Sequence, residues 1–319
     1  RVERAAVAAE ELCVDAKQKH GMNPNMHLTC TNMDMKKIEV ALEQCKAAGI
    51  TNILALRGDP PVGQEKWEAT EGGLSCALDL VKYIKKEHGD YFSVSVAGYP
   101  EGHPNNMTTV ASLEELTPSE RERCNVLKND AGEVVINVCR DEAYKAEMEY
   151  LKAKVDAGAK FIVTQMVFDA AVYNHFVLAC RAYGIDCPVV PGIMCINGFG
   201  GFKRMTAFCK SRVPDKMFAR LEAVQEDDKE VKALGVTLGA ELCRDLLAFG
   251  APGLHFYTLN LANTTLAIID EVFPAKAESR RICDVLADFK AQGTPFVSIE
   301  FFPPKTDKGV ETLSTVITK

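Results

Sequence analysis

Apolar runs of strand length alternate along the chain with longer helical patterns. The range 34–48 shows the spacing of one buried helix face, with apolar side chains at Ile38, Ala41, Leu42 and Cys45. Near-continuous apolar runs predict strands at 26–30, 52–59, 92–100, the end of 154–169, 187–194, 253–260 and 296–302. Strands that alternate with helices of about 10–15 residues indicate βαβ units and a parallel α/β sheet.

The predicted strands leave two architectures open. A (β/α)8 barrel needs eight strands, whereas an open doubly wound sheet has no such requirement. Most of the predicted strands end in polar side chains, which are His27 and Thr29, Arg57 and Asp59, Tyr99 and His103, Gln165, His255 with Tyr257 and Asn260, and Glu300. Any one of them is more often a structural hydrogen bonder. Their recurrence favours a shared site at the mouth of a barrel.

Residues 105–140 break the alternation of strands and helices. They are polar and rich in turn residues, with one apolar piece, VVINV, that follows the turn-like sequence NDAGE. We predict that this segment is an insertion in a loop of the barrel, with a hairpin inside it.

Composition and charge narrow the class of protein. The chain has 319 residues, of which 47% are hydrophobic and 25% charged, a composition typical of globular proteins. Its net charge of -7 disfavours a nucleic acid or an anionic membrane as a partner, and no apolar run reaches the ~18–20 residues of a membrane span. The cysteines include no Cys-x-x-Cys pair and follow no signal peptide. We therefore predict reduced thiols in a cytoplasmic protein without a metal site.

Seven longer motifs carry a resemblance to a known family. They are HLTC, LALRGDPP, VAGYPEGHP, KVDAGAKFIVTQMVFD, VPGIM, LHFYTLN and SIEFFPPKT. Together they resemble methylenetetrahydrofolate reductase, a flavoprotein with a (β/α)8 TIM barrel, over most of the chain outside 105–140. The resemblance implies that barrel, with FAD as its cofactor.

The resemblance also implies the reaction. A hydride passes from NADH or NADPH to FAD and then to 5,10-methylenetetrahydrofolate, which becomes 5-methyltetrahydrofolate. The five-membered ring of the folate has to open first, and opening requires a proton on the departing nitrogen. Glu300 matches the family's general acid, and we expect Phe301 and Phe302 to raise its pKa by desolvation. The alternative for Glu300 is a structural ion pair with Lys305 or Arg57.

The other site residues are assigned by the same resemblance. Asp59 matches an aspartate between flavin and folate, where its charge would stabilise the cationic iminium. Gln165 matches a residue that contacts folate and nicotinamide, and Tyr257 matches an aromatic residue of the substrate cleft. The positions that match the FAD site are His27, Arg57, Gly58, Asp59, Ala97, Tyr99, His103, Glu147 and Lys154. Within it, Lys154 suits the pyrophosphate and Glu147 the ribose hydroxyls.

The order of the motifs departs from that of the family. There the EFFPP strand comes first and is followed by a second strand with an FAD-contacting loop; here EFFPP comes last and the second strand is missing. We therefore divide the chain into 1–276, the main body of the barrel, and 277–319, which matches the family's N-terminal helix and first strand. Either the chain is circularly permuted, or a native N-terminal segment stands after the body. We favour the second, which predicts that Lys276 and Ala277 lie far apart.

Two other functions stay open. One is a flavin- or folate-binding barrel without catalysis, against which stands the presence of both Glu300 and Asp59. The other is a different barrel flavoenzyme, such as a proline dehydrogenase, although LRGDPP together with EFFPP favours the reductase. The sequence does not distinguish NADH from NADPH, and the family resemblance implies self-association into a homo-oligomer.

Overall fold

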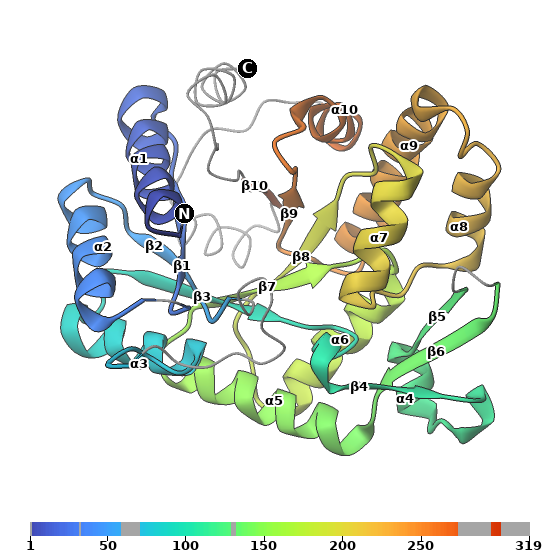
Figure 1. Ribbon diagram of the computed structural model, residues 1–319, viewed down its shortest axis with the longest axis horizontal. Coiled ribbons are helices and arrows are strands. Elements are labelled where there is room, and N and C mark those ends of the chain that lie inside the picture. The colour runs from blue at the N-terminus through green and yellow to red at the C-terminus, as the bar shows by residue number, and fades with distance from the viewer. Residues whose placement is uncertain (1, 32, 59–70, 129–131, 274–294, 301–319) are drawn as a thin grey trace.

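The structure is a computed structural model that describes residues 2–31, 33–58, 71–128, 132–273 and 295–300. Its centre is a sheet whose strands lie side by side in the order of the chain (Figure 1). These strands are β1 (Asn25–Thr29), β2 (Asn52–Leu56), β3 (Ser93–Gly98), β7 (Phe161–Met166), β8 (Val189–Met194), β9 (Gly253–Tyr257) and β10 (Phe296–Glu300). Every neighbouring pair among them is parallel.

The sheet curls until its first and last strands face each other. His27 of β1 and Glu300 of β10 stand at opposite ends of the strand order, yet Nδ1 and Oε1 are 3.5 Å apart. A doubly wound sheet reverses its strand order near the middle, so that alternative is wrong and the (β/α)8 barrel is confirmed. Within the described residues, the barrel has seven strands. Among these residues no backbone pairing joins β10 to β1, where the strand predicted to be missing would lie.

Helices surround this sheet (Figure 1). They are α1 (Val2–His20), α2 (Met35–Ala47), α3 (Ala77–His88), α5 (Asp141–Asp156), α6 (Ala170–Ala182), α7 (Phe199–Cys209), α8 (Asp215–Glu222), α9 (Asp228–Ala248) and α10 (Ala262–Val272). Asp34 caps α2 by accepting the backbone N–H of Lys37 at 2.9 Å. The predicted apolar face of α2 is buried, including Ile38 and Leu42. Burial of a side chain of this size stabilises the fold by roughly 1.5–3 kcal/mol.

The segment after β3 forms a second, smaller sheet. Its elements are η1 (Pro104–Asn106), β4 (Met107–Val110), η2 (Leu113–Glu115), α4 (Pro118–Arg123), β5 (Asn125–Lys128) and β6 (Val134–Cys139). The strands pair antiparallel in the order β4-β6-β5. VVINV lies in β6 and pairs with β5, so the hairpin predicted from NDAGE is confirmed.

A short segment after α7 joins the small sheet to the barrel. Lys210 donates from Nζ to the carbonyl oxygen of Pro104 at 3.0 Å. Arg212 donates from its guanidinium group to the carbonyl oxygen of Arg121 at 3.0 Å, and from its backbone N–H to the carboxylate of Glu101 at 2.9 Å. The segment 210–212 therefore contacts the part of the chain that forms the small sheet and the loop after β3 at the same time.

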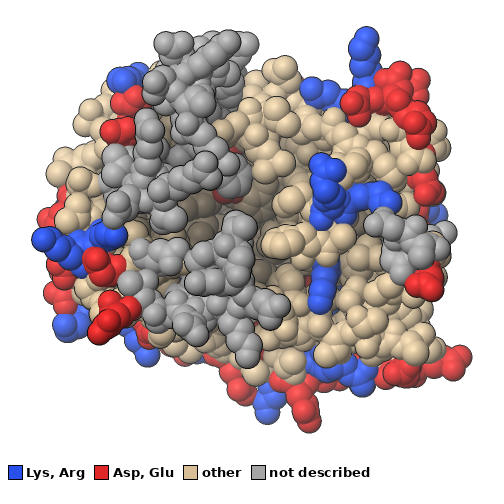
Figure 2. Space-filling view, in the orientation of Figure 1, with Lys and Arg blue, Asp and Glu red and all other residues tan. Residues whose placement is uncertain are grey.

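The surface carries mixed charge. Figure 2 shows acidic and basic side chains interspersed around the outer edge of the molecule in this view. In the part of the chain that the structure describes, no helix combines the length and apolarity that crossing a bilayer requires. The break expected at Lys276–Ala277 and most of the segment 277–319 lie outside the described residues.

Candidate active site

Side chains from β1, β9 and β10 meet inside the barrel. Glu300 lies between two histidines: Oε1 is 3.5 Å from Nδ1 of His27, and Oε2 is 3.7 Å from Nε2 of His255. The pairing of β9 with β10 sets His255 beside Ser298 and Tyr257 beside Glu300. Because side chains alternate along a strand, these four residues share the inner face.

The protonation of Glu300 differs from what its sequence neighbours predicted. Burial raises its pKa, but the contact with His255 and the charges of His27 and His255 outweigh burial, so the pKa lies below its ordinary value. Burial lowers the pKa of His27, although the negative charge of Glu300 opposes this shift by raising it. The described residues thus favour an ionised Glu300, whereas the sequence predicted a neutral one. Phe301 and Phe302, on which that prediction depended, lie outside the described residues.

Tyr257 closes one side of this cluster. Its hydroxyl group donates to the carbonyl oxygen of Thr164 at 2.7 Å, and its ring meets that of His255 edge-on with centroids 4.9 Å apart. Gly192 makes room for the ring, because a Cβ there would collide with Tyr257 and with the Thr164 carbonyl group. Burial raises the pKa of the Tyr257 hydroxyl well above its usual range, so it is a neutral donor. Gln165 follows on β7 and is half-buried, with Oε1 accepting the next backbone N–H at 3.0 Å.

Residues predicted to hold FAD form a second cluster at the end of β3. Lys154 on α5 is buried and donates from Nζ to the carbonyl oxygen of Ala97 at 2.9 Å. Its Nζ is 4.9 Å from the ring centroid of Tyr150. Burial lowers the pKa of Lys154 to about 8, with the charge of Glu147 opposing. A buried ammonium group that faces a neutral carbonyl is a favourable place for an anionic ligand.

Glu147 on α5 holds the loop that follows β3. Its carboxylate accepts the backbone N–H of His103, with both oxygens 2.9 Å from that nitrogen, and the side-chain amide of Asn106 at 2.8 Å. The rings of Tyr99 and His103 are in contact, with centroids 4.7 Å apart. Burial raises the pKa of Glu147, although these donors oppose it. The structure brings Tyr99, His103, Glu147 and Lys154 together, while their role in binding stays a prediction.

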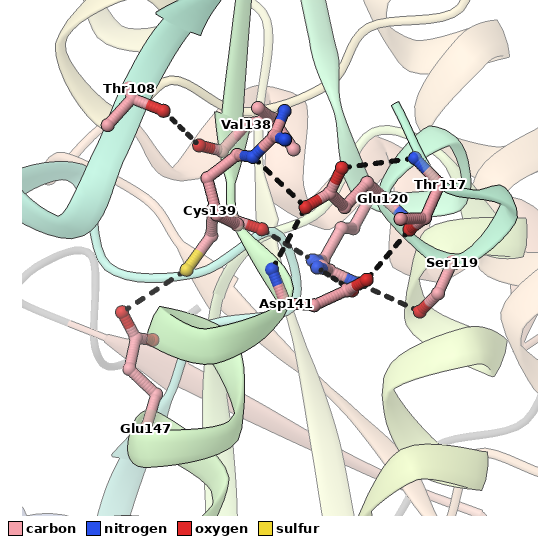
Figure 3. Close-up of polar contacts among 10 residues, drawn as sticks. Thr108, Thr117, Ser119, Glu120, Val138, Cys139, Asp141 and Glu147 are labelled. Carbon is pink, nitrogen blue, oxygen red and sulfur yellow. Dashed lines mark hydrogen bonds and ion pairs between the residues drawn. The ribbon is translucent and has the colours of Figure 1, made fainter. Parts of the chain in front are cut away.

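A polar network fixes the start of α5 against the small sheet (Figure 3). Arg123, fully buried at the end of α4, donates to the carbonyl oxygen of Cys139 at 2.9 Å and pairs with Asp141 at 2.6 Å. Glu120 accepts the backbone N–H of Asp141 at 3.0 Å. The thiol of Cys139 lies 3.8 Å from Oε1 of Glu147. These contacts of α4 and β6 therefore help to set the position of Glu147.

The end of β2 contributes Arg57 and Gly58. The carbonyl oxygen of Arg57 accepts a hydrogen bond from the Thr29 hydroxyl group at 2.6 Å and another from the Thr31 hydroxyl group. Gly58 has a φ of 82°, and a Cβ at this position would collide with both threonine hydroxyl groups, so glycine is required. Asp59, predicted to lie between flavin and folate, is outside the described residues.

Three residues of this region received no role from the sequence. The sequence marks His255 only as a polar residue at a strand end. It gives no role to Ser298, whose Oγ lies 2.9 Å from Nδ1 of His255. The signal for Ser298 was the period of two that puts it on the same face as Glu300. Glu101 is buried, and burial raises its pKa to about 7. Glu101 stands within the motif VAGYPEGHP, but no local pattern indicates its burial, because its hydrogen-bond donor, Arg212, is 111 positions away.

Residues 4–272 match the sequence model of a family described as methylenetetrahydrofolate reductase. The chain belongs to the methylenetetrahydrofolate reductase family. A probable methylenetetrahydrofolate reductase (NADH) from Oryza sativa subsp. japonica is 47% identical over 76% of this chain and 37% of its own length. A probable methylenetetrahydrofolate reductase (NADPH) from Caenorhabditis elegans is 35% identical over 82% of this chain and 35% of its own length. The 5,10-methylenetetrahydrofolate reductase of Pectobacterium carotovorum subsp. carotovorum is 32% identical over 79% of this chain and 70% of its own length.

The resemblance to methylenetetrahydrofolate reductase is thus confirmed at the level of the family. The chain spans little more than a third of the Oryza and Caenorhabditis relatives. A solved structure described as an uncharacterized protein from Clostridium thermocellum that binds two copies of 5-methyl-5,6,7,8-tetrahydrofolic acid also matches. It has 10% identity and a TM-score of 0.39, over 95% of this chain and 76% of that one.

Proposed function

We propose that this chain reduces 5,10-methylenetetrahydrofolate to 5-methyltetrahydrofolate, with the hydride coming from NADH or NADPH through bound FAD. Membership of the methylenetetrahydrofolate reductase family supports this reaction. Within the chain, the proposal rests on Glu300, a carboxyl group held inside the barrel between His27 and His255. Ring opening of the folate needs a general acid in such a position.

The described residues fit FAD. The ammonium group of Lys154 is buried against a neutral carbonyl group, so a pyrophosphate would supply the negative charge that it lacks there. Glu147 lies on the same helix and would accept hydrogen bonds from the ribose hydroxyl groups. When bound, FAD supplies the transfer of a hydride from nicotinamide to folate in two separate half-reactions. The residues proposed to hold it are His27, Arg57, Gly58, Asp59, Ala97, Tyr99, His103, Glu147 and Lys154.

Glu300 is proposed to protonate the departing ring nitrogen of the folate, which opens the ring to an iminium. The carboxyl group has to be protonated for this step. The lowered pKa of His27 makes that ring neutral near pH 7, which removes its charge from the neighbourhood of Glu300. A folate that covers Glu300 would exclude water from it, and this desolvation raises the pKa of Glu300 from its lowered value. After the product leaves, solvent returns the proton.

Three residues are proposed to bind the folate. Tyr257 presents its ring beside Glu300, and Gln165 presents its amide from the end of β7. Asp59 would place a negative charge near the iminium and stabilise it.

The proposal is tested by anaerobic visible spectroscopy of the purified chain. We expect a yellow protein that loses its flavin absorbance with NADH or NADPH and regains it with 5,10-methylenetetrahydrofolate. The nucleotide that acts faster is the preferred one. Glu300→Gln should keep the first step and slow the second by about a hundredfold or more. Glu241→Gln, on the outer helix α9, is the matched control.

Two results would rule the proposal out. One is a chain that binds no FAD when FAD is supplied. The other is a flavin that is reduced by the nucleotide but never reoxidised by the folate, which would indicate a binding protein or a different flavoenzyme.

A further inference from the structure

His255 and Glu300 carry two buried polar atoms that face each other. Neither Nε2 of His255 nor Oε2 of Glu300 has a hydrogen-bond partner among the described residues. The two atoms are 3.7 Å apart, just beyond hydrogen-bond reach. Because an unsatisfied buried polar atom is costly, a small side-chain rotation that joins these two atoms is favourable.

The other nitrogen of the His255 ring already has a partner. Nδ1 lies 2.9 Å from Oγ of Ser298, which stands at the same register level on β10. A hydroxyl group that donates to Nδ1 leaves the ring hydrogen on Nε2. That hydrogen is then directed at Oε2 of Glu300.

The other titratable groups facing Glu300 are already engaged differently. His27 comes from β1 and faces the other oxygen, Oε1, at 3.5 Å. Tyr257 comes from β9, but its hydroxyl group donates to Thr164 at 2.7 Å. Among the described residues, these two and His255 are the titratable groups that act on the carboxyl group or are acted on by it. His255 is the one with a buried, unsatisfied atom opposite Oε2.

We propose that His255 is a positioning residue that keeps the transferable proton of Glu300 on Oε1. Ser298 donates to Nδ1, and Nε2 donates to Oε2. In a protonated carboxyl group, one oxygen carries the hydrogen and the other is left as an acceptor. Because Oε2 accepts the hydrogen bond from His255, the proton is on Oε1. The proton leaves Oε1 for the folate nitrogen, and the carboxylate keeps its bond to His255 until solvent returns a proton. This inference rests on the role proposed above for Glu300.

The first test measures the carboxyl group of Glu300 without any substrate. Protein labelled with carbon-13 at its glutamate carboxyl carbons is titrated by NMR, and Glu300→Gln identifies the signal. His255→Asn keeps a group for Ser298 but removes Nε2, whereas His255→Gln places an amide near the position of Nε2. Because His255 lowers the pKa of Glu300, the Asn variant should titrate at higher pH and the Gln variant near the wild type. His175→Asn, on α6, is the matched control.

An unchanged titration of Glu300 in His255→Asn would overturn the proposal. Equal shifts in the Asn and Gln variants would also overturn it, because the position of Nε2 would then not matter. Ser298→Ala changes less buried volume and provides a second variant. It should shift the titration of Glu300 in the same direction as His255→Asn.

The second test separates this inference from the proposed function. In His255→Asn, reduction of the flavin by the nucleotide should keep its wild-type rate, while reoxidation by the folate slows by about ten- to a hundredfold. His255→Gln should recover part of that loss. A wild-type chain that never reduces the folate, but whose Glu300 titration still shifts in His255→Asn, would refute the proposed function alone. A normal folate step in His255→Asn would refute the positioning role alone.

Discussion

The carboxylate of Glu147 holds the backbone N–H of His103, with each of its oxygens 2.9 Å from that nitrogen. This contact ties the loop after β3 to a helix that comes 44 positions away in the chain. The same loop carries Tyr99, and the same helix carries the buried Lys154. One carboxylate therefore ties the loop that carries Tyr99 and His103 to the helix that carries Lys154, three of the residues proposed to bind FAD.

Removal of that carboxylate should loosen FAD binding. We expect Glu147→Ala to lower the free energy of unfolding by about 1–3 kcal/mol, because the donors of His103 and Asn106 lose their acceptor. Glu147→Gln, which keeps one acceptor oxygen, should lose less. FAD retained after gel filtration and urea unfolding measure the two effects. Glu149→Ala, exposed on the same helix, is the control, and full FAD retention in Glu147→Ala would contradict the prediction.

The buried ammonium group of Lys154 should make stability depend on pH. Its pKa is lowered by burial to about 8, against 10.5 for an unperturbed lysine. Between these values the unfolded chain holds the proton and the folded chain does not, so the free energy of unfolding rises with pH. The rise, at most roughly 3 kcal/mol, should disappear in Lys154→Met. Urea unfolding from pH 7 to 10 measures it, with Lys145→Met as control; parallel curves for wild type and Lys154→Met would refute it.

Glu101 should produce the opposite slope at lower pH. Burial raises its pKa from 4.5 to about 7 in the folded chain. Between these values the folded chain holds the proton and the unfolded chain has lost it, so the free energy of unfolding falls as pH rises. Glu101→Gln should remove this fall and be more stable than the wild type at pH 8. Thermal unfolding from pH 5 to 8 checks this, with the exposed Glu114→Gln as control. A Glu101→Gln curve that keeps the wild-type slope would count against it.

Gly192 should tolerate no side chain. Gly192→Ala pushes a methyl group into the ring of Tyr257, which should lower the free energy of unfolding by about 1–3 kcal/mol and raise KM for the folate. Gly201 on α7 has nothing within 4 Å of an added Cβ, so Gly201→Ala should be neutral or slightly stabilising. Chemical unfolding and steady-state kinetics measure both variants. An unchanged stability and KM in Gly192→Ala would mean that the ring does not need this space.

The barrel was predictable because parallel strands covered on both faces are near-continuous apolar runs. Strands β2 and β8 are such runs, and both were located from the sequence alone. Strand β4 was missed, because MTTV is short and half polar and becomes a strand through its pairing with β6. Whether this segment forms a strand depends on β6, which is distant in the sequence and is not indicated by the local pattern.

The sequence predicts which residues form the site better than it predicts which of them are in contact. His27 and Glu300 were both named, but that they meet depends on the closure of the sheet, which no local pattern encodes. The protonation of Glu300 differs from the prediction for the same reason, because the histidines that lower its pKa come from other strands and are not its sequence neighbours. The network around Arg123 joins separate elements and left no signal in the sequence.

Residues 210–212 should make the small sheet and the barrel unfold as one cooperative unit. Detaching the small sheet would break the bonds from Lys210 to Pro104 and Met107. It would also leave the buried side chain of Asn125 without Ser211, to whose carbonyl oxygen it donates. Local opening of β5 and β6 therefore costs these contacts with the barrel in addition to those within the small sheet. Their amide hydrogens should exchange with solvent as slowly as those of β7 and β8, and a protease should find no cleavable intermediate in which the insertion alone has come loose.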